Sequence, residues 1–397
     1  MLQALIDGLA DQGGPCQVDV LTTYPLADAL EPPADHGDVG VSIISYRPRE
    51  LVFPLLPLAL LAFVADRLGA PGRLFRRTPA LRSLSDADVV VDLAGISFAD
   101  GRGIPVLVYN VLMTGIPLLL GCCVVKCSQA LGPFRRPLNR WAATAVLTRV
   151  QEIVARGQDT MTHLDALQLP RVSLGADLAF TLRVGDGARA EALRLAREAV
   201  DHHEYVALVP SEVVRRYCAG RGIDYVAVLR DFVRRLLDDG ERVIILAHAT
   251  RTGRGRSRMN DLPLIETIAT HIDSPELGVL DRSLPPDVLR ALVGHSTVTV
   301  TGRFHAMISA LAEGTPVLVT GWSHKYAEVL REFDLEDWAQ PYDELDADSL
   351  YARYRALRSV EDEVTGKIRG AIERQRGAAG INFEAIERGR AVAGSRR

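Results

Sequence analysis

The sequence predicts an α/β fold built from two Rossmann-like domains that face a cleft. The chain has 397 residues, which is more than one ordinary core needs and enough for two domains. Short apolar runs alternate with helical patterns along the first half, as is typical of parallel βα units. After a polar, helix-forming linker at 181–204, the same alternation begins again.

Residues 1–180 are expected to form the first domain. Its predicted strands and short edge elements are, in order, 17–21, 39–44, 88–93, 117–125, 145–149 and 171–174. Because ligand loops follow the carboxyl ends of strands in such sheets, the loops 94–101 and 127–134 should face the cleft.

Residues 205–345 are expected to form the second domain, followed by C-terminal helices and a basic tail at 346–397. The predicted strands are 205–209, 242–247, 277–280, 297–301 and 316–320. The predicted helices are 223–237, 262–271, 286–293 and 305–313, with a long charged helix at 347–376. Two successive halves of this kind are the GT-B arrangement.

Composition and charge argue against several classes of protein. Hydrophobic residues at 48% and charged residues at 24% are typical of a globular protein, and the net charge of −4 argues against a nucleic-acid partner. The five cysteines form no CxxC pair, which favours buried thiols in a reducing cytoplasm over a metal site. The acidic and histidine-rich stretch 201–204 is interpreted as a solvated turn rather than a metal site. No signal peptide is visible at Met1, so we expect a cytoplasmic protein.

Two apolar stretches have membrane-like composition. The stretch 104–125 is predicted to be a helix followed by a strand, because three residues interrupt it: Asn110, Gly115 and Pro117. The stretch 51–64 is too short to cross a bilayer, which takes about 20 residues, and arginines flank it: Arg47, Arg49, Arg67, Arg73, Arg76 and Arg77. It is either a core helix or a peripheral contact, through residues 47–77, with the inner face of an anionic membrane.

The strongest chemical signal follows the predicted strand 297–301. Gly302 permits a tight turn, and His305 begins a helix whose backbone N–H groups attract anions. Arg303 adds bidentate recognition of carboxylate or phosphate, and His305 can donate or accept a proton near neutral pH. The alternative is a structural helix-start histidine beside a solvated arginine, and both interpretations stay open on these grounds.

Two neighbouring loops add polar and cationic side chains. Three residues follow the next predicted strand and should share one sheet edge with Arg303: Ser323, His324 and Lys325. The basic loop 248–261, which includes His248 and Arg251, suits phosphate binding or closure over a cleft, unless it is only solvated. No P-loop and no dinucleotide fingerprint appears in the sequence.

The chain resembles the polysaccharide pyruvyl transferase family over most of its length. Residues 302–317 match the arginine–apolar–histidine segment of that family, its helix and its G-x-P strand, and 322–326 match its lysine motif. Weaker matches occur in order upstream: a glycine loop ending in aspartate at 92–100, a G-P-F loop at 128–134, an A-R-E-like segment at 155–157 and a D-x-A-F segment at 177–180.

The resemblance implies a GT-B-like transferase that needs no metal or other cofactor. It would transfer pyruvate from phosphoenolpyruvate, as a ketal, to sugar hydroxyls of a cell-surface polysaccharide or a lipid-linked glycan precursor. Arg303 would hold the carboxylate or phosphate of the donor, His305 would be the general acid, and Lys325 would neutralise the phosphoryl group. The remaining donor-site residues would be Gly302, Ser323, His324, His248 and Arg251. The residues on the acceptor side would be Gly95, Asp100, Ser128 and Arg156.

Three features depart from the family pattern. Met1 lies within the first helix of that pattern, so either the start is placed too late or the first domain lacks its first strand, which would leave a sheet edge open. Gly95 stands alone where relatives carry two or three glycines, and Gly157 replaces a glutamate. Two other functions stay open: a GT-B glycosyltransferase with a nucleotide-sugar donor, and a catalytically inactive relative that binds glycans.

Overall fold

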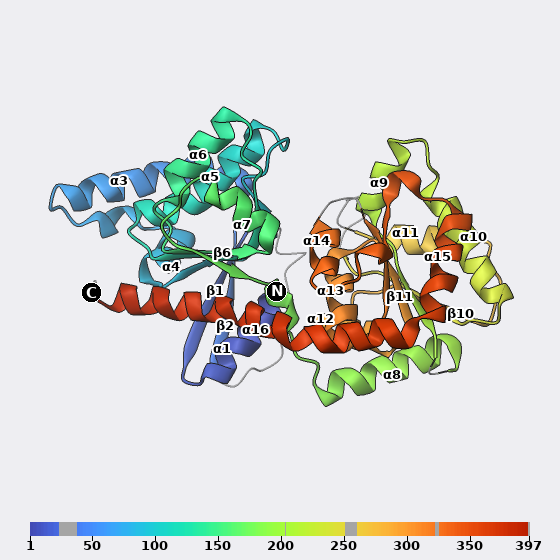
Figure 1. Ribbon diagram of the computed structural model, residues 1–397. Helices are drawn as coiled ribbons and strands as arrows, with labels where there is room; N and C mark the ends of the chain where they lie inside the picture. Colours follow the sequence, from blue (N-terminus) through green and yellow to red (C-terminus); the bar gives the residue numbers. More distant parts are fainter. Residues whose placement is uncertain (24–37, 203, 251–259, 322–324, 396–397) are drawn as a thin grey trace. The chain divides into compact units, whose positions relative to one another are not determined.

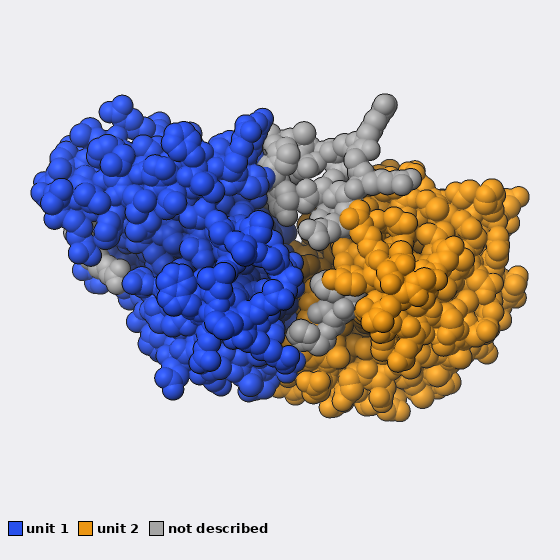
Figure 2. Space-filling model, turned by 90° about the horizontal axis from the view of Figure 1, so that it is seen from above, with its two compact units in different colours: residues 1–181, 376–397 blue, residues 182–375 orange. Residues whose placement is uncertain are grey.

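The computed structural model describes residues 1–23, 38–202, 204–250, 260–321 and 325–395, and it divides into two compact units (Figures 1 and 2). Unit 1 comprises Met1–Thr181 and Arg376–Arg397, and unit 2 comprises Leu182–Gln375. Both units are α/β with parallel strands, which confirms the predicted pair of Rossmann-like domains. The stretch 181–204, predicted as a linker, contains a helix of unit 2, and the last helix of the chain has residues in both units.

Unit 1 contains two parallel sheets. The first pairs β1 (Cys16–Thr22) with β2 (Val39–Ser45). The second has the order β3 (Val90–Asp92), β5 (Val124–Leu131), β6 (Glu152–Arg156), β7 (Val172–Gly175), with β4 (Ile96–Ser97) also paired to β5. The helices of unit 1 are α1 (Leu2–Gln12), α2 (Pro48–Glu50), η2 (Leu51–Leu55), α3 (Leu56–Arg67), η3 (Gly72–Phe75), α4 (Pro79–Asp86), α5 (Ile104–Leu119), α6 (Pro137–Leu147), α7 (Gln158–Asp165), η4 (Leu178–Thr181) and the end of α16 (Glu361–Gly394).

The two sheets of unit 1 end in strands that have a single strand partner. Within the part of the chain that the structure describes, β1 pairs only with β2, and β3 pairs only with β5. Any open sheet has such edges, so the missing first strand of this domain stays a prediction.

Two of the predicted strands of unit 1 are wrong. The stretch 117–125 is the end of α5, a turn in which Gly121 has a φ of 79°, and only then the start of β5. Pro117 stays inside the helix because α5 buries Leu112 and Ile116 in the core, and this packing outweighs a helix-breaking residue near the helix end. The stretch 145–149 is the end of α6 and the turn after it; the strand forms later, as β6.

Unit 2 contains one parallel sheet of six strands. Their order is β10 (Leu277–Leu280), β9 (Val243–Leu246), β8 (Val206–Val209), β11 (Val298–Thr301), β12 (Val317–Gly321), β13 (Ala339–Pro341). Around it lie α8 (Asp186–Val200), α9 (Glu212–Ala219), α10 (Tyr225–Asp238), α11 (Leu262–Ala269), α12 (Pro286–His295), α13 (Phe304–Glu313), α14 (Lys325–Arg331), η5 (Glu336–Trp338), η6 (Tyr342–Glu344), α15 (Ala347–Ser359) and the start of α16.

The strand order of unit 2 reverses in the middle of the sheet. The chain runs from β8 outward through β9 to β10, and then returns to place β11 on the other side of β8. In open parallel sheets the crevice at such a switch point, outside the carboxyl ends of the strands, is where ligands bind. The predicted strands and helices of this unit are present, except that 347–376 is broken at Val360 into α15 and α16.

Candidate functional site

The candidate site lies at the switch point of unit 2, where β8 and β11 end side by side. Ser211 and the start of α9 follow β8, and Gly302 and Arg303 follow β11. Gly302 N–H donates to the Val209 carbonyl at 3.1 Å, which joins the two strand ends. The structure therefore brings the predicted Gly302–His305 segment to the place where the topology favours a ligand.

Gly302 is required for the close approach of these two strand ends. A Cβ added to it would lie 3.0 Å from Ser211 Cβ and 3.0 Å from Val214 Cγ2. Both distances are shorter than ordinary packing allows, so a larger residue would push the turn away from β8. The turn is fixed further by Thr301, whose Oγ1 accepts a hydrogen bond from Arg303 N at 2.9 Å.

Arg303 forms a buried ion pair with Asp261. Its Nη2 donates to Asp261 Oδ1, and Asp261 is fully buried. The same carboxylate accepts hydrogen bonds from Glu212 N and Ala249 N, each at 3.0 Å, and so joins the segments after β8, β9 and β11. A buried carboxylate with these three donors is well satisfied. The alternative of a solvated Arg303 is therefore wrong, because the guanidinium is held in the interior.

Two histidines flank this ion pair. His248 follows β9 and is half-buried. Burial first, and then the nearby His305 and Arg303, lower the pKa of His248 to about 3, so its ring is neutral at physiological pH. His305 lies in the first turn of α13, with its ring edge-on to Phe304 at a centroid distance of 5.5 Å. A neutral His248 ring can accept a hydrogen bond at one nitrogen and donate one at the other, so it can orient a group beside Arg303 without adding charge.

Lys325 is brought to the same turn from the end of β12. Its Nζ lies 4.7 Å from the centroid of the Phe304 ring and 5.3 Å from that of Tyr326, within cation–π range. The Tyr326 hydroxyl donates to the Gly302 carbonyl at 3.0 Å, which ties the start of α14 to the Gly302 turn. Lys325 therefore lies beside the Gly302 turn, as predicted. The other residues predicted near this turn, Ser323, His324 and Arg251, lie outside the described residues.

The predicted acceptor-side residues of the glycine loop organise unit 1. Asp100 Oδ2 accepts from Arg135 N at 2.7 Å and Arg136 N at 3.2 Å, so it holds the loop after β4 against the loop after β5. The Gly95 carbonyl accepts from Ala130 N at 3.2 Å. Their role toward an acceptor stays a prediction.

Ser128 and Arg156 point into the interior of unit 1. Ser128 is fully buried in β5, and its Oγ accepts from Leu178 N at 3.0 Å. Arg156 is buried in β6, and its Nη1 lies 3.1 Å from Asp177 Oδ2. The expectation that Ser128 lies in a loop is wrong, because β5 continues to Leu131. Both side chains point inward in this unit, and their role toward an acceptor stays a prediction.

The backbone conformation at position 157 explains why glycine stands there. Its φ is 85°, a left-handed region in which glycine is unstrained, and it precedes α7. A glutamate with this backbone would be strained, so the departure from the family pattern fits the local structure.

Two residues of the site, Asp261 and Ser211, were not predicted from the sequence. Asp261 closes a basic loop and directly precedes the Leu262-Pro263 helix start, so its position before a helix was the available signal. Ser211 follows β8 and is buried, and its hydroxyl has no hydrogen-bond partner among the described residues. A strand followed by Pro-Ser-Glu carried no distinctive signal.

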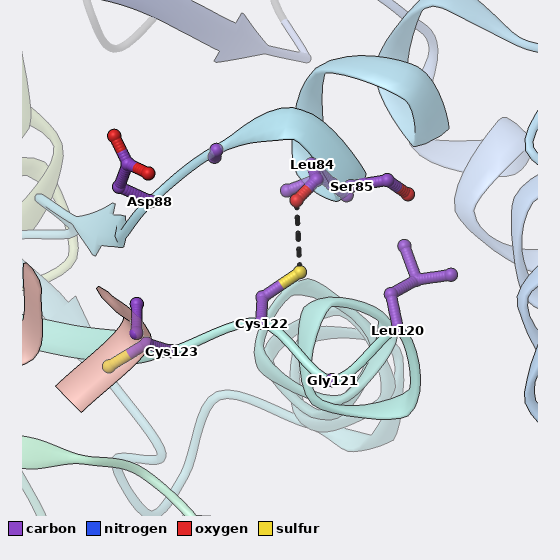
Figure 3. Close-up of a pocket in the computed structure, with 9 residues that line it drawn as sticks. Leu84, Ser85, Asp88, Leu120, Gly121, Cys122 and Cys123 are labelled. Atoms are coloured by element: carbon purple, nitrogen blue, oxygen red, sulfur yellow. Dashed lines mark hydrogen bonds between the residues drawn. The ribbon is translucent and has the colours of Figure 1, made fainter. Parts of the chain in front are cut away.

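A separate pocket in unit 1 lies away from the carboxyl edge of its sheet (Figure 3). Leu84, Asp88, Cys122 and Cys123 line it, at the amino ends of β3 and β5. Cys122 Sγ donates to the Leu84 carbonyl at 3.0 Å, and burial raises the pKa of this thiol to about 11. A protonated thiol in an apolar setting is a packing group. Among the residues that the structure describes, no group of three or more histidine, cysteine or acidic side chains is arranged to hold a metal.

The chain is similar to proteins of known family and to solved structures. Residues 3–324 match the family model described as polysaccharide pyruvyl transferase. No curated protein matches the chain. Among solved structures, α,α-trehalose 6-phosphate synthase from Burkholderia multivorans is similar at 13% identity, with a TM-score of 0.55 over 99% of this chain and 92% of that one.

Other similar structures belong to epimerases. UDP-GlcNAc 2-epimerase from Neisseria meningitidis, bound to UDP-GlcNAc, has 12% identity and a TM-score of 0.54 over 94% of this chain and 99% of that one. The S. aureus MnaA–UDP structure has 12% identity and a TM-score of 0.51, over 90% and 91%. At these identities the likeness shows a shared fold, that of GT-B glycosyltransferases and epimerases.

Proposed function

The chain belongs to the polysaccharide pyruvyl transferase family, and we propose that it transfers pyruvate from phosphoenolpyruvate to sugar hydroxyls of a cell-surface polysaccharide or its lipid-linked precursor. As a member of that family it is a transferase. The observation that carries the donor proposal is the gathering of Arg303, His305 and Lys325 at one strand-end turn of unit 2.

The donor has two anionic groups, a carboxylate and a phosphate, and their binding calls for several fixed cations. The Asp261 carboxylate fixes the orientation of the Arg303 guanidinium. Because a guanidinium has several N–H donors, it can bind Asp261 through Nη2 and a donor oxyanion as well. Lys325 supplies a second positive charge beside the same turn.

The proposed reaction needs one proton donor at the enol carbon. His305 protonates C3 of phosphoenolpyruvate, which leaves a stabilised cation at C2. A sugar hydroxyl then attacks C2 and returns a proton to His305, and loss of phosphate lets a second hydroxyl close the ketal. In balance, one hydroxyl proton ends on C3 and the other on the released phosphate. The low pKa of His248 keeps its ring neutral, so no second cationic ring repels His305 while His305 carries the proton.

The test is phosphate release from phosphoenolpyruvate with candidate lipid-linked sugars. Arg303→Ala and His305→Ala are expected to lower the rate at least about 100-fold, since each removes a group that acts on the donor. Arg369→Ala and His271→Asn are the matched controls, because both side chains are exposed elsewhere in unit 2. Parent-like rates in both site variants would show that Arg303 and His305 do not act on the donor.

A thermal-shift comparison separates the two other functions. Only a true ligand raises the melting temperature of the fold, so phosphoenolpyruvate should stabilise the protein and UDP-sugars should not. Stabilisation by a UDP-sugar alone would favour a glycosyltransferase. Glycan binding without any phosphate release would favour an inactive relative.

A further inference from the structure

The segment from Leu51 to Leu74 presents an apolar face to solvent. The inner side of the segment packs against the core of unit 1. Leu51, Leu55, Ala59 and Ala62 are buried with residues of α4 and α5 in one core cluster. Leu55, Ala59 and Ala62 recur every three or four residues, so they lie on one face of α3, whereas Leu51 precedes the break at Phe53. In Figure 1, α3 projects from the rest of unit 1.

The opposite side of the same segment carries apolar side chains where a soluble helix usually carries polar ones. We call the following six residues the apolar face, given with their exposed fractions: Phe53 73%, Leu60 43%, Leu61 49%, Val64 49%, Leu68 79% and Leu74 53%. The spacing of Leu60, Leu61, Val64 and Leu68 places them on one helix face. A gathered, exposed apolar surface of this kind marks an interaction site.

Positive charge surrounds the apolar face. Residues 47–77 contain six arginines and two carboxylates, a net charge of +4 in a chain whose net charge is −4. Asp66 is occupied by Arg76 at 2.6 Å. Five of the six arginines are exposed, before α3 and from its last residue onward: Arg47, Arg49, Arg67, Arg73 and Arg77. Apolar side chains bordered by arginines are complementary to a bilayer with anionic headgroups.

The geometry favours a helix that lies on a membrane over one that spans it. By length and composition the run Pro48–Arg67 could cross a bilayer, and only 22% of its 18-residue apolar window is buried. However, the run is broken at Phe53, where φ is −152° and ψ is 120°. The regular helix α3 has 12 residues and is therefore about 18 Å long, against about 30 Å of hydrocarbon. Its inner face is also committed to the core of unit 1.

We propose that the apolar face and its flanking arginines dock unit 1 on the surface of an anionic lipid bilayer, with α3 lying in the interface. The proposal does not depend on the donor chemistry, although it would bring the enzyme to a lipid-linked acceptor. Vesicle binding and phosphate release are separate measurements, so the two proposals fail separately.

The first experiment is flotation of the full chain with phosphatidylcholine vesicles that contain about 30% phosphatidylglycerol, compared with phosphatidylcholine alone. The parent should float with the anionic vesicles, and less so at high salt. Leu60→Gln/Leu61→Gln/Val64→Gln should weaken binding at least about tenfold, because it removes inserted apolar area. Leu174→Gln is the control, since this leucine is 45% exposed on β7 of the same unit. Equal binding by the triple variant, or no binding by the parent, would overturn the proposal.

The second measurement uses a variant whose surface stays apolar. It therefore tests the proposal even if the triple variant does not fold. In Leu61→Trp, lipids brominated on their acyl chains should quench the added fluorescence, whereas in Leu174→Trp they should not. Light scattering of the parent and the triple variant adds a further outcome. A parent dimer that becomes a monomer in the triple variant would show that a second copy covers the apolar face, and the membrane proposal would be wrong.

Discussion

Arg303 and Asp261 form a buried ion pair that joins the end of β11 to the segments after β8 and β9. Its partners lie 42 residues apart in the chain and meet only when the sheet of unit 2 is assembled. Removing one partner of such a pair leaves a buried charge without compensation, which is strongly destabilising. The pair therefore links the stability of unit 2 to the geometry of the proposed donor site.

Asp261→Asn is expected to lower the free energy of unfolding by about 3 kcal/mol. The Asp261 carboxylate accepts its hydrogen bonds with two oxygens, whereas an asparagine amide has only one acceptor oxygen. The amide is also uncharged, so it cannot neutralise Arg303. Urea unfolding measures the loss. In a double-mutant cycle with Arg303→Met, the two changes should be far from additive, because they remove the same interaction. Additive effects would show that the pair is not coupled.

Gly302→Ala should destabilise unit 2 by about 1–3 kcal/mol and lower phosphate release, because its Cβ would meet Ser211 and Val214 at 3.0 Å. Gly187→Ala is the matched control: this glycine lies in α8 with nothing within 4 Å of an added Cβ. The control should be neutral or slightly stabilising. Equal melting temperatures for both variants would contradict the close approach described at Gly302.

Lys325→Met should raise the KM for phosphoenolpyruvate about tenfold while the melting temperature changes little. Methionine keeps an apolar contact with Phe304 but removes the charge that is proposed to meet the phosphoryl group. Steady-state kinetics over a range of donor concentrations separate KM from kcat. A parent-like KM would exclude Lys325 from donor binding.

His248 should make stability depend on pH. Its pKa is lowered to about 3 in the folded protein, against about 6.5 when unfolded, so between these values the unfolded chain binds more protons. Stability should therefore fall as the pH drops below about 6.5, by at most about 1.4 kcal/mol per pH unit. His248→Asn should flatten this slope in urea unfolding between about pH 6.5 and 5. An unchanged slope would mean that His248 does not titrate in this way.

The sequence predicted most of what is set locally. The alternation of apolar strands with helices gave the strands and helices of unit 2, and the β-branched run before Gly302 placed Arg303 and His305 at a strand end. The switch point could not be predicted in this way, because strand order is a property of the assembled sheet.

Residues whose role is set by packing were predicted less well. Pro117 suggested a helix end, but burial of α5 carries the helix past it. Ser128 and Arg156 were assigned to an acceptor, yet their polar groups bind Leu178 and Asp177 in the interior. The role of Asp261 depends on three backbone segments that only the fold brings together.

The most direct test of the central claim is phosphate release from phosphoenolpyruvate and a lipid-linked sugar by the parent and by His305→Ala. We predict acceptor-dependent release by the parent and a rate at least about 100-fold lower in the variant, while His271→Asn keeps the parent rate and both variants keep the parent melting temperature. Equal release by the parent and His305→Ala, or no release by the parent with any acceptor while UDP-sugars stabilise the fold, would contradict the account.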